Sequence, residues 1–372
     1  MKILELCLSP SLGGLELYML RTVRALSQSD DVLSVIHDAG QLKNYFKKET
    51  LPFLTERVSF RALPILAAKR LADLIDARNI DVLHLHWGKD LPLAAFAKAF
   101  SRKKPRLVYT RQMKLTRDKD DFYHNFLYRQ MNRMLVITDQ LAVEARRYLS
   151  PVNAAKIVRL YYGVDAPSQF LGTSKRQEIR TALGIAPESF LVGLFGRIEE
   201  KKGQHLLIEA LNHARMDALK IKGLIVGQAM NEAYLKRLKD HVNQQGLSKT
   251  IIFKGFVNNV QEWMQVCDCV VLATNEETFG LVLVEAMHAG VAVVGSDSGG
   301  VPEIIDDGKT GLLFPAGDGK ALYRSLAKLK ENPVLRKAIA LAGKEKAQQQ
   351  FSSKAHFENL RDHLKPEFCT KQ

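Results

Sequence analysis

Short apolar, β-branched runs alternate with longer amphipathic stretches along all 372 residues, and this alternation restricts the possible folds most strongly. Runs such as Leu-Val-Gly-Leu-Phe at 191–195 are apolar at every position, which is typical of strands covered by helices on both faces. The strands expected in the first half are 3–8, 32–36, 58–63, 82–86, 107–110, 134–138 and 157–161, and those in the second half are 190–195, 223–226, 251–253, 269–273, 291–295 and 311–314. This pattern predicts an α/β protein with doubly wound parallel sheets.

The chain is long enough for two such domains, since a typical domain has ~100–200 residues. Gly, Pro and Ser concentrate between 163 and 174, which indicates a linker. We therefore expect a first domain over residues 1–165 and a second over residues 175–351. In sheets of this kind ligands bind at the carboxyl ends of the strands, so the loops that follow the strands are the candidate sites.

The charge balance is basic, with 54 Lys and Arg against 40 Asp and Glu and a formal net charge of +14. Residues 1–165 hold 27 basic and 17 acidic residues, a net charge of +10, and residues 98–119 alone hold nine cations and one acid. Such a run attracts phosphates, nucleic acid or anionic lipid, or it is simply a solvated face. Four scattered cysteines are typical of a reducing cytosol, and no apolar run approaches the ~20 residues of a membrane span.

Two loops of the first half contain candidate ligand-binding residues. Gly13 and Gly14 lie between the first strand and an expected helix, where paired glycines allow backbone to approach an anionic ligand, although a plain tight turn has the same pattern. His84 and His86 lie on one face of the fourth strand. A zinc site would need further ligands, and none follows at a suitable spacing, so a hydrogen-bonded core histidine is the alternative.

Two loops of the second half carry stronger signals. Arg197 and Lys202 follow a strand and precede a helix, where their charges could converge on phosphate oxygens. Glu277 and Glu285 form an E-x7-E spacing around the start of a short apolar helix, where an acid is costly unless it is paired or faces a ligand. The helix rise separates the two acids by ~12 Å, which favours binding of different parts of one ligand over acid–base hydrolysis. The alternative is an N-capping Glu277 with an incidental Glu285.

Taken in order, these motifs resemble glycosyltransferase family 4, whose members are retaining transferases of the GT-B fold with two Rossmann-like domains facing each other across a cleft. The resemblance extends over nearly the whole chain. The matching pieces are Gly13-Gly14-x-Glu16, His84-x-His86, Gly163-Val164-Asp165, Gly196-Arg197 with Lys202-Gly203, Glu277 to Glu285, Gly299-Gly300-Val301-Pro302-Glu303 and Thr310-Gly311-Leu312. In this fold the last helix crosses back, so the resemblance implies that residues 352–372 pack on the first domain.

The resemblance also implies roles for individual residues. Arg197 and Lys202 would hold the nucleotide diphosphate and stabilise it as the leaving group, without a metal ion or a dedicated nucleophile. Glu277 would contact the donor sugar and Glu285 the ribose, while His86 would lie on the acceptor side of the reacting centre. The donor-binding set is completed by Gly13, Gly14 and the backbone around Phe279, Gly280 and Leu281.

The chain departs from the family pattern after the fifth strand. Where many members have Thr-x-His, this sequence has Thr110-Arg111-Gln112, so Gln112 can hydrogen-bond but not titrate, and Arg111 could bind an anionic acceptor or donor. Tyr162 replaces the common Asn at the junction. With Glu16, the residues Arg111 and Gln112 form the expected acceptor side.

The predicted function is transfer of a sugar from a nucleotide donor, expected to be UDP-linked, to a lipid-linked or surface-polysaccharide acceptor of the lipopolysaccharide or capsule type. The expected partners are therefore a nucleotide-sugar donor and an anionic glycolipid or polysaccharide acceptor, and not nucleic acid. No cofactor is expected. A protein of this kind would be cytoplasmic, with the basic run offering peripheral contact to the anionic inner face of the membrane. The alternatives are a basic nucleic-acid-binding protein and a catalytically silent GT-B scaffold that binds nucleotide sugars.

Overall fold

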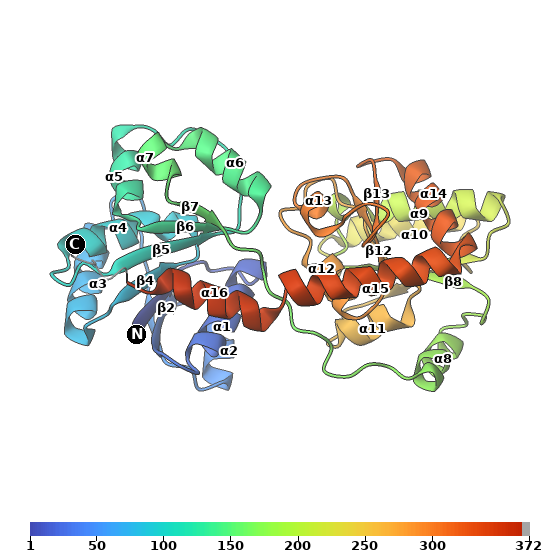
Figure 1. Cartoon of the computed structure of the whole chain (residues 1–372), viewed down its shortest axis with the longest axis horizontal. Helices are drawn as coiled ribbons and strands as arrows, with labels where there is room; N and C mark the ends of the chain where they lie inside the picture. The colour runs from blue at the N-terminus through green and yellow to red at the C-terminus, as the bar shows by residue number, and fades with distance from the viewer. Residues whose placement is uncertain (367–372) are drawn as a thin grey trace. The chain divides into compact units, whose positions relative to one another are not determined.

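The computed structural model describes residues 1–366, which form two compact α/β units, each built on a parallel sheet (Figure 1). Unit 1 comprises Met1–Tyr161 together with the described residues from Lys354 onward, and unit 2 comprises Tyr162–Ser353. Residues 367–372 of the predicted C-terminal segment, which include Cys369, lie outside the described residues. The two parallel sheets confirm the predicted doubly wound α/β class.

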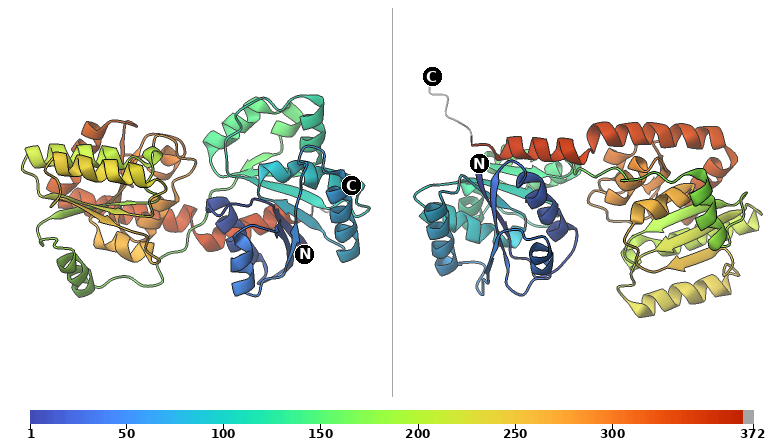
Figure 2. Two further views of the ribbon diagram at one scale, coloured as in Figure 1. Left: turned by 180° about the vertical axis from the view of Figure 1, so that it is seen from behind. Right: turned by 90° about the horizontal axis from the view of Figure 1, so that it is seen from below.

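Unit 1 contains a sheet whose strand order is β3-β2-β1-β4-β5-β6-β7, the doubly wound order in which the chain reverses direction between β1 and β4. Helices cover both faces (Figure 2). The strands are β1 (Lys2–Cys7), β2 (Asp31–His37), β3 (Phe53–Glu56), β4 (Val82–Leu85), β5 (Arg106–Arg111), β6 (Arg133–Val136) and β7 (Ile157–Arg159). The helices are α1 (Gly14–Leu26), α2 (Leu42–Lys48), α3 (Ile65–Arg78), η1 (Gly88–Asp90), α4 (Leu91–Phe100), α5 (Phe122–Gln130), α6 (Asp139–Tyr148), α7 (Pro151–Ala154) and α16 (Ser353–Leu364).

Unit 2 repeats this arrangement with the strand order β10-β9-β8-β11-β12-β13. Every residue of β8 and β11 is buried, as their uninterrupted apolar sequences predict. The strands are β8 (Phe190–Phe195), β9 (Ile221–Val226), β10 (Ile251–Lys254), β11 (Cys269–Leu272), β12 (Ala292–Ser296) and β13 (Leu312–Phe314). The helices are α8 (Thr173–Ala182), η2 (Glu200–Lys202), α9 (Gln204–Met216), α10 (Glu232–Gln244), α11 (Val260–Val266), α12 (Leu281–His288), α13 (Val301–Ile304), α14 (Gly319–Glu331) and α15 (Pro333–Gln350).

The third strand of unit 1 is not where the sequence pattern predicts it. β3 is Phe53–Glu56 rather than residues 58–63, and it pairs with β2 at the edge of the sheet. An edge strand is only half-buried and therefore carries a weak apolar signal. The apolar residues that suggested the later position, Phe60 and Leu63, lie in a loop and are 66% and 50% exposed.

Helix α16 belongs to unit 1 although it ends the described chain. Its residues Leu360 and Leu364 are fully buried in the core that α1 and the sheet form, and Phe357 packs against the same core. Outside this apolar face, the guanidinium of Arg361 binds the Asp30 carboxylate with an N–O distance of 2.6 Å. The helix therefore contributes both apolar burial and an ion pair to a unit that is otherwise formed by the start of the chain.

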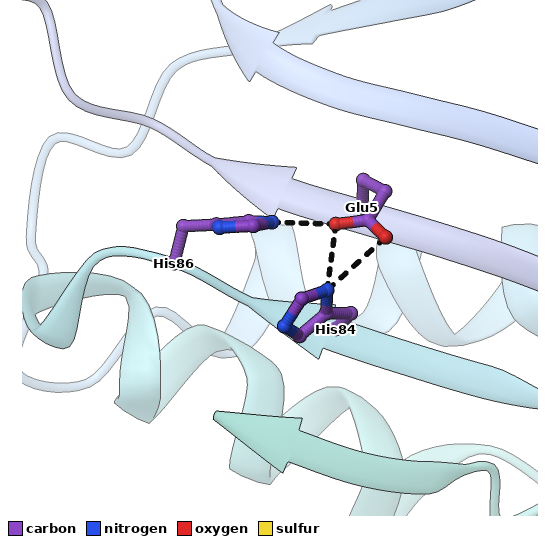
Figure 3. Close-up of side chains that lie close together, drawn as sticks. All are labelled: Glu5, His84 and His86. Carbon is purple, nitrogen blue, oxygen red and sulfur yellow. Dashed lines mark hydrogen bonds and ion pairs between the residues drawn. The ribbon is translucent and has the colours of Figure 1, made fainter. Parts of the chain in front are cut away.

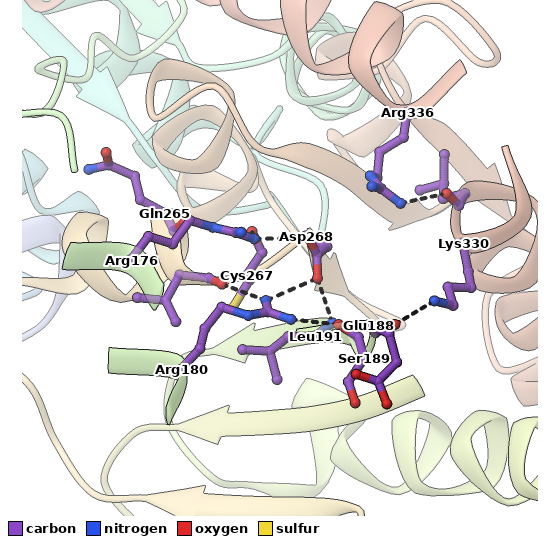
Figure 4. Close-up of polar contacts among 12 residues, drawn as sticks. Arg176, Arg180, Glu188, Ser189, Leu191, Gln265, Cys267, Asp268, Lys330 and Arg336 are labelled. Atoms are coloured by element: carbon purple, nitrogen blue, oxygen red, sulfur yellow. Dashed lines mark hydrogen bonds and ion pairs between the residues drawn. The ribbon is translucent and has the colours of Figure 1, made fainter. Parts of the chain in front are cut away.

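Unit 2 contains a buried charge network that fixes α8 (Figure 4). Asp268, just before β11, binds Arg176 and Arg180 of α8 with N–O distances of 2.9 and 3.1 Å. Its Oδ2 atom also accepts the backbone N–H of Leu191 in β8 at 2.8 Å, and Arg180 donates to the carbonyl oxygen of Ser189. One carboxylate thus joins the first helix of unit 2 to two neighbouring strands.

Candidate active site

The carboxyl edge of the unit 2 sheet brings two predicted site residues together. Lys202 ends η2, after β8, and its Nζ atom lies 3.2 Å from Oε2 of Glu277, which follows β11. Both side chains are largely buried, with 26% of Lys202 and 16% of Glu277 exposed. Because β8 and β11 are neighbours in the sheet, the loops after them meet even though 75 residues separate the two side chains.

Two glycines make this approach possible. Gly203 has a φ of +70°, and a Cβ atom there would lie 2.0 Å from the carbonyl oxygen of Ala273. Gly299 has a φ of +63°, and a Cβ atom there would lie 1.7 Å from the carbonyl oxygen of Glu277. Both contacts are far shorter than any side chain permits, so the sequence requires glycine at both positions. The loops after β8 and β12 are thereby held against the loop that carries Glu277.

The other predicted cation of this edge is placed differently. Arg197 lies just after β8, its side chain is 61% exposed, and its guanidinium pairs with Glu199 at 3.3 Å. Its backbone carbonyl accepts a hydrogen bond from the Gln204 side chain at the start of α9, which fixes the loop. The backbone of Arg197 is therefore held, while most of its side chain is exposed to solvent.

Helix α12 starts at the remaining predicted donor-binding residues. Gly280 is its N-cap, with a φ of +108°, and Leu281 is its first residue. The ring of Phe279 is buried against Tyr162 and Phe351, so only its backbone is available to a ligand. Glu285 lies in the second turn and is half-buried. The first N–H groups of a helix lack intrahelical partners, which gives this edge anion-binding capacity beside Lys202.

In unit 1, the loop between β1 and α1 contains the predicted glycines. Gly13 is the extended N-cap of α1, and Gly14 is its first residue. A Cβ atom built on Gly14 would meet no described atom within 4 Å, so open space adjoins the backbone there. Glu16, in the first turn, is only 5% exposed and is therefore largely withdrawn from solvent.

His84 and His86 belong to a buried cluster that the sequence pattern did not reveal (Figure 3). Both imidazoles bind the carboxylate of Glu5 in β1, His86 through Nε2 at 2.5 Å and His84 through Nδ1 at 2.9 Å. The Nε2 atom of His84 lies 2.7 Å from Oγ1 of Thr110 in β5. Glu5 pairs with His84 in the register of the adjacent strands β1 and β4, which explains why residues so distant in sequence meet. The only sequence signal was an acid inside an apolar strand, which is costly unless it is paired.

Glu5 and His86 of this cluster have shifted pKa values. Burial raises the pKa of Glu5, but the charges and hydrogen bonds of His84 and His86 outweigh burial and lower this pKa to about 2. Burial, aided by the His84 charge, lowers the pKa of His86 to about 4. His86 is therefore neutral at pH 7 and donates its Nε2–H to Glu5. Its Nδ1 atom is left as an acceptor with no hydrogen-bond partner in residues 1–366.

The sequence expectation that His84 and His86 lack a third metal ligand is wrong, because Glu5 completes a group whose ligand atoms lie within 4.8 Å of one another. The oxygen–nitrogen distances of 2.5 and 2.9 Å to Glu5 are hydrogen-bond lengths. Ligands of a tetrahedral zinc ion are farther apart, at about 3.3 Å for bonds of ~2.05 Å. The observed geometry is that of a hydrogen-bonded triad.

Arg111 ends β5 and Gln112 follows it, and both are buried, with 9% and 8% of their surfaces exposed. The basic run of residues 98–119 therefore does not form one patch. β5 passes through the core in its middle, so the exposed Arg102 and Lys103 precede the strand at one edge of the sheet. The exposed Arg117 follows it at the opposite edge.

Comparison with known proteins identifies the chain. A family model described as Glycosyltransferase Family 4 matches residues 12–167, and one described as Glycosyl transferases group 1 matches residues 175–346. The lipopolysaccharide core biosynthesis mannosyltransferase LpsB of Rhizobium meliloti (strain 1021) is 29% identical over 275 residues, covering 70% of this chain and 74% of LpsB. The corresponding mannosyltransferase LpcC of Rhizobium leguminosarum bv. viciae is 27% identical, covering 69% of this chain and 70% of LpcC.

A solved structure is similar along almost the whole chain. The crystal structure of HepE from Anabaena in complex with UDP and glucose has a TM-score of 0.82 and 25% sequence identity, covering 98% of this chain and 99% of HepE. The two family models match the two units in order, and the predicted enzyme class is confirmed. The chain belongs to glycosyltransferase family 4 and is a glycosyltransferase of the GT-B fold.

Proposed function

We propose that this enzyme transfers a sugar, with retention of anomeric configuration, from a UDP-linked donor to a lipid-linked or surface-polysaccharide acceptor of the lipopolysaccharide or capsule type. The donor class is supported by HepE, which has been crystallised with UDP and with UDP-glucose. The acceptor class is supported by LpsB and LpcC, whose names place them in lipopolysaccharide core biosynthesis, and by the capsular polysaccharide enzyme CapM of Staphylococcus aureus, which is 26% identical.

The observation that carries the donor-site proposal is the contact between Lys202 and Glu277 beside the start of α12. Lys202 would bind the diphosphate, and Glu277, held by that lysine, would accept hydrogen bonds from donor hydroxyls. Arg197 would leave the half-buried Glu199 carboxylate and bind the more strongly charged diphosphate. Backbone N–H groups at Gly280 and Leu281 would add to this charge stabilisation.

In the proposed reaction, the acceptor hydroxyl oxygen forms a bond to the anomeric carbon on the face from which the diphosphate departs. The bond between that carbon and the phosphate oxygen breaks, and the departing oxygen accepts the hydroxyl proton. Lys202 and Arg197 would stabilise the charge that develops on the leaving group, which is the largest contribution expected of such preorganised groups. Because two cations supply this charge, we expect transfer to continue in excess EDTA.

The remaining proposed roles lie on the ribose and acceptor sides. Glu285 would accept hydrogen bonds from the ribose hydroxyls. In unit 1, Gly13 and Gly14 would allow the loop to approach the diphosphate, with Glu16 on the acceptor side. His86 would accept a hydrogen bond from an acceptor hydroxyl at its unprotonated Nδ1 atom, and Glu5 would act as its positioning residue.

We also propose peripheral contact with the anionic inner face of the cytoplasmic membrane. Within residues 1–366, no helix has the length and apolar character needed to cross a bilayer. The exposed cations Arg102, Lys103 and Lys104 offer a basic contact. Reversing these three charges should release the protein from vesicles containing anionic phosphatidylglycerol, as should raised salt. Unchanged vesicle binding would contradict this part of the proposal.

A thermal-shift screen of UDP-, GDP- and ADP-sugars tests the donor proposal. A ligand at 100 times its dissociation constant stabilises the folded protein by ~2.7 kcal/mol, which is easily measured as a rise in melting temperature. We expect UDP-sugars to raise the melting temperature of the wild-type chain, and Lys202→Ala to reduce the rise. A larger shift with GDP- or ADP-sugars would contradict the proposal that the donor is UDP-linked. No shift with any of these sugars would overturn the donor-site assignment.

A further inference from the structure

Unit 1 contains a cavity of about 540 Å3 at the carboxyl edge of its sheet. Its walls come from residues after β4, such as Trp87, from the end of β5 and the loop after it, such as Arg111 and Leu115, and from α5, such as Tyr128. This volume lies within the ~300–1,000 Å3 typical of small-molecule sites. The residues that line the cavity all belong to unit 1.

Among the described residues, no Asp or Glu side chain lines this cavity, whereas six Lys and Arg side chains and two histidines, His86 and His124, do. The lining cations are Arg61, Lys89, Arg111, Lys114, Arg117 and Lys119. Two of them are neutralised, since Arg61 binds Asp90 at 2.7 Å and Lys114 pairs with Glu144 at 3.5 Å. The other four have no ion pair with a carboxylate within residues 1–366, so the wall carries an uncompensated positive charge.

The buried cation of this wall is held in place but incompletely bonded. Arg111 donates to the hydroxyl of Tyr109 at 3.1 Å and to the carbonyl oxygen of Lys114 at 2.8 Å. Both partners are neutral, and the Nε atom of Arg111 has no hydrogen-bond partner among the described residues. The guanidinium is thus fixed in orientation, while its charge and one donor are left for a ligand.

Two neighbouring lining residues are also incompletely bonded. The Nε2 donor of Gln112 and the Nδ1 acceptor of His86 are buried and have no partner within the described chain. A buried polar group without a hydrogen bond destabilises the folded protein, so three such groups in one wall indicate a site that a ligand completes. Donors on Arg111 and Gln112 suit an oxyanion, and the acceptor on His86 suits a hydroxyl group.

The remaining cations increase the positive charge around Arg111. Burial lowers the pKa of Lys119, and the like charges of Arg117 and Arg111 lower it further. The charge of Asp121 opposes this lowering only in part, and its carboxylate is already hydrogen-bonded to His124. An anion in the cavity would relieve this repulsion, whereas a neutral sugar would not.

We propose that the acceptor of this transferase carries a phosphate or carboxylate group, and that this anion binds in the unit 1 cavity to Arg111, Gln112 and Arg117 while an acceptor hydroxyl bonds to His86. The inference rests on the proposed function, because it assigns the charge of the acceptor that receives the sugar. According to this proposal, the enzyme accepts anionic glycans as acceptors and rejects uncharged glycans.

The test is a calorimetric titration of the full chain with hexose 6-phosphate, with hexuronate and with the neutral hexose. We expect the phosphate or the carboxylate probe to bind at least tenfold more tightly than the neutral hexose, and the stronger of the two identifies the anion. Arg117→Gln and Arg111→Gln should each weaken that probe at least tenfold. Lys47→Gln is the matched control, since it removes one exposed cation of unit 1 that does not line the cavity and should leave binding unchanged.

A parallel titration with UDP shows whether Arg111→Gln is folded, because a correctly folded variant should still bind UDP. Arg117→Gln is a second test of the site, and it alters only an exposed side chain. Equal binding of charged and neutral probes, or equal loss of binding in Arg117→Gln and Lys47→Gln, would overturn this proposal while leaving the UDP site intact. If the wild-type chain binds the anionic probe in a manner that depends on Arg111 but does not bind UDP, the anion site is supported. The same result overturns the proposal of a UDP-linked donor.

Discussion

Replacing Lys202 separates the proposed donor site from an ordinary surface ion pair, because the chain contains a matched control next to it. Lys201 and Lys202 each contact a glutamate at 3.2 Å, Glu276 and Glu277 respectively. The first pair is 77% and 70% exposed, whereas the second is 26% and 16% exposed. The two variants Lys201→Ala and Lys202→Ala thus remove the same charge and the same type of contact from different environments.

The expected magnitudes differ accordingly. An exposed ion pair contributes ~0–1 kcal/mol, so Lys201→Ala should change kcat/KM by less than about threefold. A hydrogen bond to a charged group contributes about 1.5–3 kcal/mol, and a donor aimed at charge developing in the transition state contributes about 100- to 1,000-fold. Lys202→Ala should therefore lower kcat/KM at least about 100-fold, with the larger part of the loss in kcat.

The assay is the release of UDP from the UDP-sugar that the thermal-shift screen selects, measured at steady state for wild type and both variants. Melting temperatures of the three proteins show whether any loss reflects folding. Near-normal turnover of Lys202→Ala, or equal losses in the two variants at equal stability, would refute the reasoning that assigns the diphosphate to Lys202.

Three further predictions concern stability. Leu360→Ala should destabilise unit 1 by about 2–5 kcal/mol in urea unfolding, because it leaves a cavity in the core that α16 completes; a change below 0.5 kcal/mol would contradict that packing. Asp268→Asn should destabilise unit 2 by about 3–5 kcal/mol, because it leaves Arg180 buried without its charge partner. The exposed Glu178→Gln should cost less than about 0.5 kcal/mol, and equal costs would argue against the network. Burial lowers the pKa of His356 from 6.5 to about 4, so the unfolded chain binds the proton first and stability should fall by about 3 kcal/mol between pH 6.5 and 4. His356→Gln should flatten this part of the melting-temperature profile, and an unchanged slope would exclude His356 as its source.

Much of the fold is predictable from local sequence because buried parallel strands are apolar throughout. β8 and β11 are examples, and the predicted doubly wound class follows from them. The edge strand β3 was misplaced because its half-exposed residues resemble a loop, while the exposed Phe60 and Leu63 in the loop resemble a strand. An apolar sequence indicates that a segment is buried. At the edge of a sheet a strand is only partly buried, so the apolar pattern no longer locates the strand.

The candidate site was predictable only where its residues lie in one loop or follow a short motif. The contact between Lys202 and Glu277 depends on β8 and β11 being neighbours, which the alternation of strands and helices does not specify. Glu5 was missed for the same reason, since its partners lie 79 and 81 residues away in sequence. Likewise, only the path of β5 through the core divides the basic run into two edges and buries Arg111.

In our proposal, unit 2 binds a nucleoside diphosphate sugar through the E-x7-E segment. Calorimetric titration of UDP into wild type and Glu285→Gln tests it most directly, because binding needs no knowledge of the acceptor. We predict that UDP binds wild type and that the variant binds at least tenfold more weakly, since an acceptor for the ribose hydroxyls loses its charge. Equal UDP affinity of the two proteins at equal melting temperature would contradict the account.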